Sequence, residues 1–130
     1  MHMPVHPVPT PSAPRAIGPY SPAVRAGDWL VLSAQIGFDP ASDALVNGGT
    51  DGQVRQVLAN IVAVLNDCGA PLADVAKPTV FLVDLDDFPT VNAAYADAFG
   101  DHKPARSTIQ VAALPAGASV EIEVWAYLPA

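Results

Sequence analysis

Arg106 has the sequence surroundings that most strongly suggest chemistry. It stands within residues 104–109, Pro-Ala-Arg-Ser-Thr-Ile, at the start of a predicted strand and in apolar company. A guanidinium keeps its charge and is costly to bury without a partner. One interpretation is a structural salt bridge to Glu121 or Glu123 on a neighbouring strand. The other is a bidentate clamp for a carboxylate or phosphate of a substrate.

Glu121 and Glu123 form a second candidate group. Because they stand two apart on a predicted strand, they share one face and lie about 6–7 Å apart. Such a pair can serve acid–base chemistry on a sugar, and one carboxylate near a water can deprotonate it if burial raises its pKa. The alternative is a solvated or arginine-paired surface.

Other residues offer hydrogen bonds. Residues 18–22, Gly-Pro-Tyr-Ser-Pro, predict a rigid turn that presents the Tyr20 hydroxyl, although a tyrosine in such a loop more often simply packs. Asn92 and Tyr95 stand three apart on a predicted helix, and therefore on one side of it. Residues 48–52 are rich in glycine but lack the lysine of a Walker loop, so we interpret them as a turn and helix cap.

The sequence supports neither a metal site nor a covalent nucleophile. None of the three histidines has the paired spacing of a metal-binding motif. Ser33, Ser107 and Cys68 have no histidine nearby in a recognisable nucleophile motif. Cys68 is the only cysteine, which excludes an intrachain disulfide, and it falls on the apolar stripe of a predicted helix.

Two amphipathic helices and several short strands must position these residues. The first helix is predicted over 50–68, with a capping box at Thr50 and Gln53 and a terminal glycine at Gly69. The second is predicted over 87–99. Predicted strands lie at 23–25, 29–33, 44–46, 79–83, 107–111 and 119–128.

This order predicts a sheet with both helices covering one face. The last strand alternates cleanly, so the other face would expose Trp125 and Tyr127 in a monomer, which favours self-association. Residues 1–14 are rich in proline, and we expect a flexible tail there with little ability to pair in a sheet. Residues 15–130 are expected to form a single domain.

The composition narrows the function classes. Of the 130 residues, 51% are hydrophobic and only 15% are charged, which also favours an oligomer because little charge is available to cover a small domain. The net charge of −7 and six scattered Lys and Arg residues argue against nucleic acid or anionic membranes as partners. No apolar run is long enough to span a bilayer, and we expect no signal peptide and a cytoplasmic location.

Several motifs, in order from Arg15 to Ala126, together resemble the YjgF family, also called the reactive-intermediate deaminase or RidA family. The most specific is Pro104-Ala105-Arg106-Ser107. The others are Ala16-Ile17-Gly18-Pro19-Tyr20-Ser21, Leu32-Ser33-Ala34-Gln35-Ile36, Asp87-Phe88, Val91-Asn92-Ala93-Ala94-Tyr95, Val111-Ala112-Ala113-Leu114-Pro115 and Val120-Glu121-Ile122-Glu123.

The resemblance implies a chorismate mutase-like α+β fold, a mixed sheet of about six strands with two helices on one face. It implies a homotrimer whose sheets close a central barrel, with clefts between subunits. It also implies hydrolysis of 2-imino acids and enamines, released by pyridoxal-phosphate dehydratases, to 2-oxo acids and ammonia without cofactor or metal. By the same resemblance, Arg106 would bind the substrate carboxylate, Glu121 would order or activate water, and Tyr20 would hydrogen-bond substrate or water. Other residues would shape the cleft: Ser33, Ala34, Asn92 and Thr108.

Four departures from the family pattern leave the substrate open. Ala34 stands where glycine is usual, Thr108 where the deaminase branch often has cysteine, and Pro78 where threonine is common; residues 100–103 form a shorter segment. One alternative is a trimeric binder or sensor of 2-oxo acids, which needs Arg106 but not a catalytic glutamate. Another is a ribonuclease or translation inhibitor, which the net charge of −7 disfavours.

Overall fold

One mixed sheet organises residues 4–129, the part of the chain that the computed structural model describes. Its strand order is β1-β2-β3-β8-β6-β7, and every neighbouring pair is antiparallel except β6 and β7. The strands are β1 (Val5–Pro7), β2 (Ala23–Ala26), β3 (Trp29–Gln35), β6 (Val75–Leu82), β7 (Ser107–Gln110) and β8 (Val120–Tyr127).

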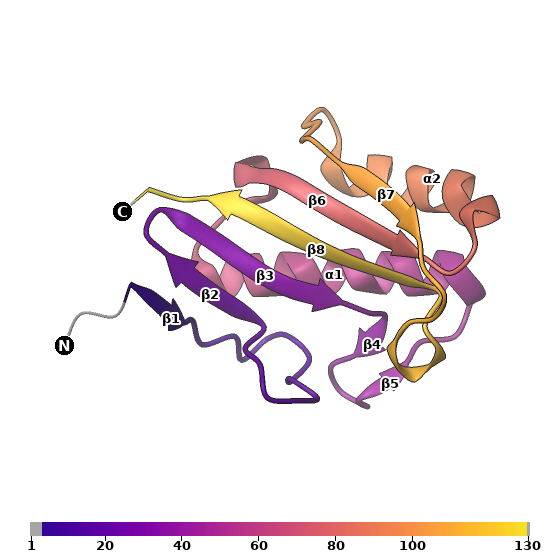
Figure 1. The fold of residues 1–130 in the computed structure, drawn as a ribbon, viewed down its shortest axis with the longest axis horizontal. Coiled ribbons are helices and arrows are strands. Elements are labelled where there is room, and N and C mark those ends of the chain that lie inside the picture. Colours follow the sequence, from indigo (N-terminus) through magenta and orange to yellow (C-terminus); the bar gives the residue numbers. More distant parts are fainter. Residues whose placement is uncertain (1–3, 130) are drawn as a thin grey trace.

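Two α-helices cover one face of this sheet. Helices α1 (Gly49–Cys68) and α2 (Phe88–Phe99) both lie behind the sheet in Figure 1, and the near face carries neither of them. The core forms where the apolar stripe of α1 meets alternate residues of the strands, because both patterns turn their apolar side inward. It includes Val54, Val57, Ile61, Leu65, Leu30, Leu32, Ile122 and Val124. The predicted α+β class, with a six-stranded mixed sheet and two helices on one face, is confirmed.

The start of α1 differs from the prediction. Gly48, with a φ of 104°, precedes the helix and no side chain caps it, so the predicted capping box is wrong. Instead, Thr50 Oγ1 lies 2.9 Å from both Asp87 Oδ2 and Ser119 Oγ. Gln53 Oε1 accepts a hydrogen bond from the Ser119 backbone N–H at 2.9 Å. These side chains therefore tie α1 to other elements instead of satisfying its own first turn.

Glycines end both helices, and Gly69 was predicted to end the first. Gly69 has a φ of 79° and donates its N–H to Asn66 O, while Ala70 N–H donates to Leu65 O at 2.9 Å. This pair of hydrogen bonds satisfies backbone carbonyls that have no partner inside the helix. Gly100 follows α2 with a φ of 59°, a conformation that glycine adopts without steric cost.

The N-terminal segment is more ordered than the proline content indicates. Val5–Pro7 forms β1 at the edge of the sheet, so the prediction of little strand pairing is wrong there. An edge strand tolerates proline because only one side must supply ladder hydrogen bonds. Ser12 N–H and Oγ–H both donate to the Asp67 carboxylate at 2.8 Å, which fastens the segment to α1. Residues 1–3 lie outside the described part of the chain.

Strand β6 begins earlier than predicted and runs through Pro78. Its pairing with β7 starts only at Thr79, so β6 is not yet flanked by that strand where the proline stands. Proline has no N–H to donate, and at this position no acceptor on β7 needs one. A separate two-stranded sheet joins β4 (Phe38–Asp39) to β5 (Ala44–Leu45), close to the predicted strand at 44–46.

Candidate active site

Arg106 lies immediately before β7 and rests against two aromatic rings of α2. Its guanidinium carbon is 4.8 Å from the centroid of the Tyr95 ring and 5.4 Å from that of Phe88. A cation above an aromatic face is attracted by the negative potential of the ring. The rings therefore support the guanidinium and leave its charge uncompensated.

No carboxylate forms an ion pair with Arg106 within residues 4–129. The ion pairs there are Arg15–Asp43, Arg55–Asp51 and Arg55–Asp97. Glu121 and Glu123 stand on β8, and β6 lies between β8 and β7. The salt bridge to either glutamate, one of the two interpretations of Arg106, is thus not formed in the described chain. The other interpretation, in which Arg106 is a bidentate clamp for a carboxylate or phosphate of a substrate, remains open.

A surface hollow of about 310 Å³ opens beside Arg106. Asn92 and Tyr95 both line it from α2, which agrees with their predicted position on one side of the helix. The loop after α2 lines it with His102 and Lys103. His102 Nε2 lies 2.8 Å from Val75 O, so the ring fastens this loop to the beginning of β6.

The contact between Tyr95 and Arg106 was not predicted, although the helical spacing had already placed Tyr95 beside Asn92. The Tyr95 ring also stacks on the Phe99 ring, with a centroid distance of 4.4 Å. The Tyr95 hydroxyl is buried without a hydrogen-bond partner in the described structure. Burial raises the pKa of Tyr95, and the positive charge of Arg106 partly offsets this. The signal available in the sequence was the seven-residue spacing of Phe88 and Tyr95, which places both rings on one helix face.

Thr108 stands two residues after Arg106 and lies on β7 itself. Its backbone pairs with Val80 of β6. The Thr108 Oγ1 is buried, and no group within residues 4–129 hydrogen-bonds to it. A buried hydroxyl without a partner is costly, so this one is available to a ligand group or an added water.

Glu121 and Glu123 lie on the open face of β8, as their alternation predicts. Both are partly buried, and Glu121 stands opposite Phe81 of β6. Burial raises the pKa of Glu121, and the negative charge of Glu123 raises it further. A carboxylate with a raised pKa is a better proton acceptor for water than an ordinary one, which suits Glu121 to general base chemistry.

A β-bulge shapes the strand next to these glutamates. The register of β3 and β8 shifts between Leu32 and Gln35, so Ser33 and Ala34 together stand opposite the single residue Glu123. Bulges of this kind redirect side chains and are frequent beside active sites. The bulge thus brings two of the predicted cleft residues next to the glutamate strand.

Tyr20 lies close to this bulge. It lines a narrow hollow of about 30 Å³ together with Ala34, and its hydroxyl accepts a weak hydrogen bond from Ile17 N–H at 3.4 Å. Ser33 Oγ donates to Ser21 O at 2.7 Å, which fastens the Tyr20 turn to β3. The predicted turn therefore presents an exposed tyrosine beside the bulge.

Within one chain the candidate residues thus form two groups on different strands. The first group lies along β7 and α2 and consists of Arg106, Asn92 and Thr108. The second lies along β8, β3 and the turn before β2 and consists of Glu121, Tyr20, Ser33 and Ala34. Strand β6 separates the two groups in the sheet.

Comparison with known proteins agrees with this architecture. The family described as Endoribonuclease L-PSP matches residues 10–128, nearly the whole chain. The chain belongs to this family. It is the YjgF/RidA family that the motifs around Arg106 indicated, so that prediction is confirmed.

Relatives of this YjgF/RidA chain include proteins from distant organisms. A RutC family protein of Pyrococcus horikoshii is 47% identical over 91% of this chain and 94% of its own length. The 2-iminobutanoate/2-iminopropanoate deaminase of Bos taurus is 48% identical over 88% of this chain and 83% of its own. The crystal structure of RidA from an Antarctic Psychrobacter matches with a TM-score of 0.90 and 41% identity, covering 95% of this chain and 99% of that one.

Two further properties of the YjgF/RidA chain bear on its function. Over residues 4–129, none of the helices has the length and apolar character needed to cross a membrane. In the same range no three His, Cys, Asp or Glu side chains are grouped so that they could hold a metal ion. The candidate site consists instead of an arginine, two glutamates and hydroxyl groups.

Proposed function

We propose that this protein hydrolyses 2-imino acids and their enamine tautomers to 2-oxo acids and ammonia. The observation that carries the proposal is the Arg106 guanidinium, which rests on two rings beside an open hollow and has no carboxylate partner within residues 4–129. Such a group suits a small anionic substrate. The names of relatives from Bos taurus and Homo sapiens, at 48% and 46% identity, support this reaction class.

In the proposed reaction, the substrate needs orientation and a water, because an imine carbon is already electrophilic. Arg106 holds the 2-carboxylate through two parallel hydrogen bonds. Glu121 accepts a proton from the water as the water oxygen bonds to the imine carbon, and it returns this proton to the nitrogen to give a carbinolamine. The hydroxyl proton of the carbinolamine then moves to the same nitrogen as the C–N bond breaks, which releases ammonia and the 2-oxo acid. Tyr20 hydrogen-bonds the substrate or water. The cleft is shaped by Ser33, Ala34, Asn92 and Thr108.

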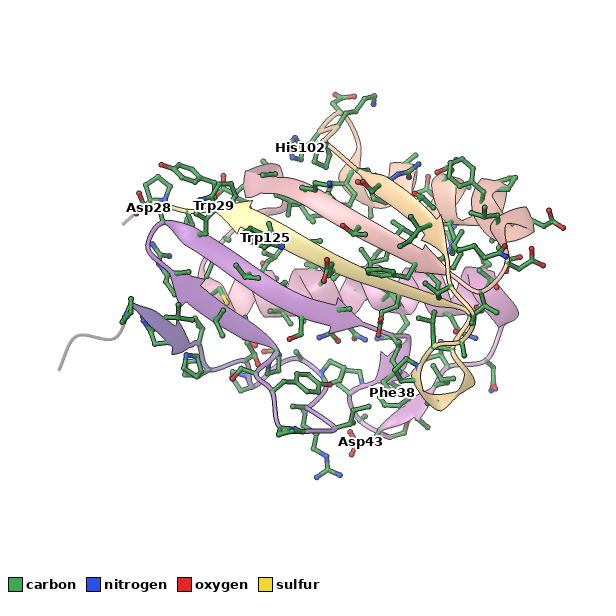
Figure 2. The ribbon with its side chains drawn as sticks, in the orientation of Figure 1. Asp28, Trp29, Phe38, Asp43, His102 and Trp125 are labelled. Carbon is green, nitrogen blue, oxygen red and sulfur yellow. The ribbon has the colours of Figure 1, made fainter. Side chains whose placement is uncertain are left out.

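The proposed working form is a homotrimer with its sites between subunits. Trp125 and Tyr127 are each 46% exposed on the open face of the sheet, and Trp29 contacts both rings at centroid distances of 6.1 and 5.2 Å. Figure 2 shows Trp29 and Trp125 together on the face that neither α-helix covers. Contiguous exposed aromatic rings favour an interface. Such an interface would also let the Arg106 group of one subunit meet the Tyr20 group of another.

Imine hydrolysis is tested by adding the protein to a serine or threonine dehydratase and following 2-oxo acid formation. We expect the wild-type protein to accelerate release of the product, and Arg106→Ala to lower kcat/KM at least about 30-fold, since truncating a buried charged contact costs roughly 2 kcal/mol or more. Arg55→Ala is the control, because it removes an arginine that is exposed on α1. No acceleration by a folded wild-type protein would overturn the proposal.

The family description favours a second candidate, an endoribonuclease. We place it behind imine hydrolysis because RNA binding depends on clustered cations, and this chain has six Lys and Arg against 13 Asp and Glu. Two of those cations, Arg15 and Arg55, are also paired with aspartates. RNA cleavage that Arg106→Ala abolishes would reverse this order.

A binder or sensor of 2-oxo acids shares Arg106 with the enzyme but not the need for Glu121. Thermal stabilisation by a 2-oxo acid without turnover, equal in wild type and Glu121→Gln, would favour that function.

We also propose a cytoplasmic location. The single cysteine supports this location, because proteins of a reducing compartment do not depend on disulfides. Fractionation of cells expressing the protein tests this.

A further inference from the structure

The hollow beside Arg106 concentrates positive charge on an acidic protein. The chain has a net charge of −7 and only six Lys and Arg residues, yet two of these, Lys103 and Arg106, line this one hollow. His102 lines it too, and no carboxylate does. Cations grouped in a concave surface focus the electrostatic potential and attract anions.

The nearby acidic residues leave this charge largely intact. Asp97 of α2 pairs with Arg55 at 3.1 Å, on the side of the helix that faces α1. Asp101 belongs to the loop before Lys103 but does not line the hollow. Lys103 Nζ has a long contact of 3.5 Å to Gly100 O and forms no ion pair within residues 4–129. An ammonium carries three donors, so Lys103 can bind a further anionic group.

The hollow is large enough to hold a small molecule. Its volume of about 310 Å³ lies at the lower end of the range for small-molecule sites, roughly 300–1,000 Å³. One carboxylate occupies Arg106 in the proposed function, which leaves the part of the hollow near Lys103 without a role. Asn92 lines the same space and offers an amide to a polar substrate group.

We propose that this hollow accepts 2-imino dicarboxylic acids, the imines derived from acidic amino acids. Arg106 binds the 2-carboxylate, and Lys103 binds the carboxylate at the far end of the substrate side chain. The inference rests on the proposed function and specifies its substrate class. The reaction stays a hydrolysis in which water adds to the imine carbon and ammonia leaves, so no further reactant is needed. The reaction that supplies such a substrate must oxidise an amino dicarboxylate at its amino carbon.

The test compares two imines made in solution by amino-acid oxidases: 2-iminoglutarate and 2-iminobutanoate. Trapping of the remaining imine with semicarbazide reports each rate. We expect Lys103→Gln to lower the ratio of kcat/KM for the dicarboxylate to that for the monocarboxylate by about 10-fold or more, mainly through KM, because a charge-assisted hydrogen bond is lost. Arg55→Gln removes the same charge from α1 and should leave the ratio within about twofold.

The outcomes separate this inference from the proposed function. If wild-type protein hydrolyses 2-iminobutanoate but Lys103→Gln leaves the ratio unchanged, the inference is wrong and the proposed function stands. If neither imine is hydrolysed faster, the proposed function fails, and calorimetry with 2-oxoglutarate and 2-oxobutanoate decides the inference. Tighter binding of 2-oxoglutarate that Lys103→Gln removes would support it. Equal affinity for the two, or inorganic phosphate binding as tightly as 2-oxoglutarate, would overturn it.

Discussion

The guanidinium carbon of Arg106 lies 4.8 Å from the centroid of the Tyr95 ring. This contact orients the cation without neutralising it, because an aromatic ring carries no net charge. A carboxylate in the same place would compete with any anionic ligand for the two parallel donors of the guanidinium. The ring therefore supports an arginine whose charge is available for the substrate carboxylate of the proposed function.

Replacing the Tyr95 ring should weaken substrate binding through Arg106. We expect Tyr95→Leu to raise KM for the imino acid several-fold, consistent with roughly 1 kcal/mol for a partly desolvated cation–π contact. Tyr95→Phe keeps the ring and should restore KM to within about twofold of wild type.

A double-mutant cycle identifies the route of this effect. In an Arg106→Ala background, Tyr95→Leu should no longer change KM, because the residue through which it acts is gone. An undiminished effect in that background would show that Tyr95 acts independently of Arg106.

The raised pKa of Glu121 predicts that ionising this carboxyl weakens the fold. The folded protein holds the Glu121 proton more tightly than the unfolded chain, so this contribution to stability is lost as pH rises from the ordinary value of 4.5 through the raised pKa. Glu121→Gln removes the ionisation. Its Tm should match wild type below that window and exceed it above, which thermal unfolding at about pH 4 and pH 7.5 would reveal. An equal difference at both pH values would contradict this explanation.

Asn60 should be important for the position of the bulged strand. It is 1% exposed, and its Nδ2 donates to Ile36 O at 3.2 Å and Phe38 O at 2.9 Å, directly after β3. Asn60→Ala would leave these carbonyls without that donor, and we expect a loss of about 1–3 kcal/mol in the free energy of unfolding. Asn66→Ala, on the exposed side of α1, should change stability by no more than about 0.5 kcal/mol. Denaturant unfolding of both variants checks the difference.

The open sheet face should lose its ability to associate when a charge is placed in the aromatic cluster. We expect Trp125→Glu to shift the protein from the proposed trimer to a monomer of 13.4 kDa, because burying an unpaired carboxylate is costly. Light scattering coupled to size-exclusion chromatography measures the mass. Trp125→Phe keeps an apolar ring and should remain trimeric, whereas a monomeric wild-type protein would refute the assembly.

Some site features could be anticipated from local pattern. The alternation of β8 placed Glu121 and Glu123 on one face, and helical spacing placed Asn92 and Tyr95 together, because both depend only on the backbone repeat. The contact of Phe88 and Tyr95 with Arg106 was not anticipated, since the three residues meet only when α2 packs beside β7. Apolar spacing identifies an inward helix face but not the group that it meets.

The predicted capping box of Thr50 and Gln53 is a second feature that local sequence pattern did not predict correctly. Its residue types fit a local motif, but both side chains instead bond to distant partners, Asp87 and Ser119. A polar side chain forms hydrogen bonds with whichever partner the fold brings within reach, and the neighbouring sequence does not identify that partner.

Sequence patterns alone therefore determine the elements of this protein, their order and inward faces, and a motif centred on Arg106. The tertiary structure decides which of the candidate residues share a surface. It separates Arg106 from the glutamates by one strand and places the arginine over Tyr95 beside Lys103 and His102. The physical reason is range: backbone periodicity acts within a few residues, whereas strand order and helix packing bring together groups that are distant in the chain.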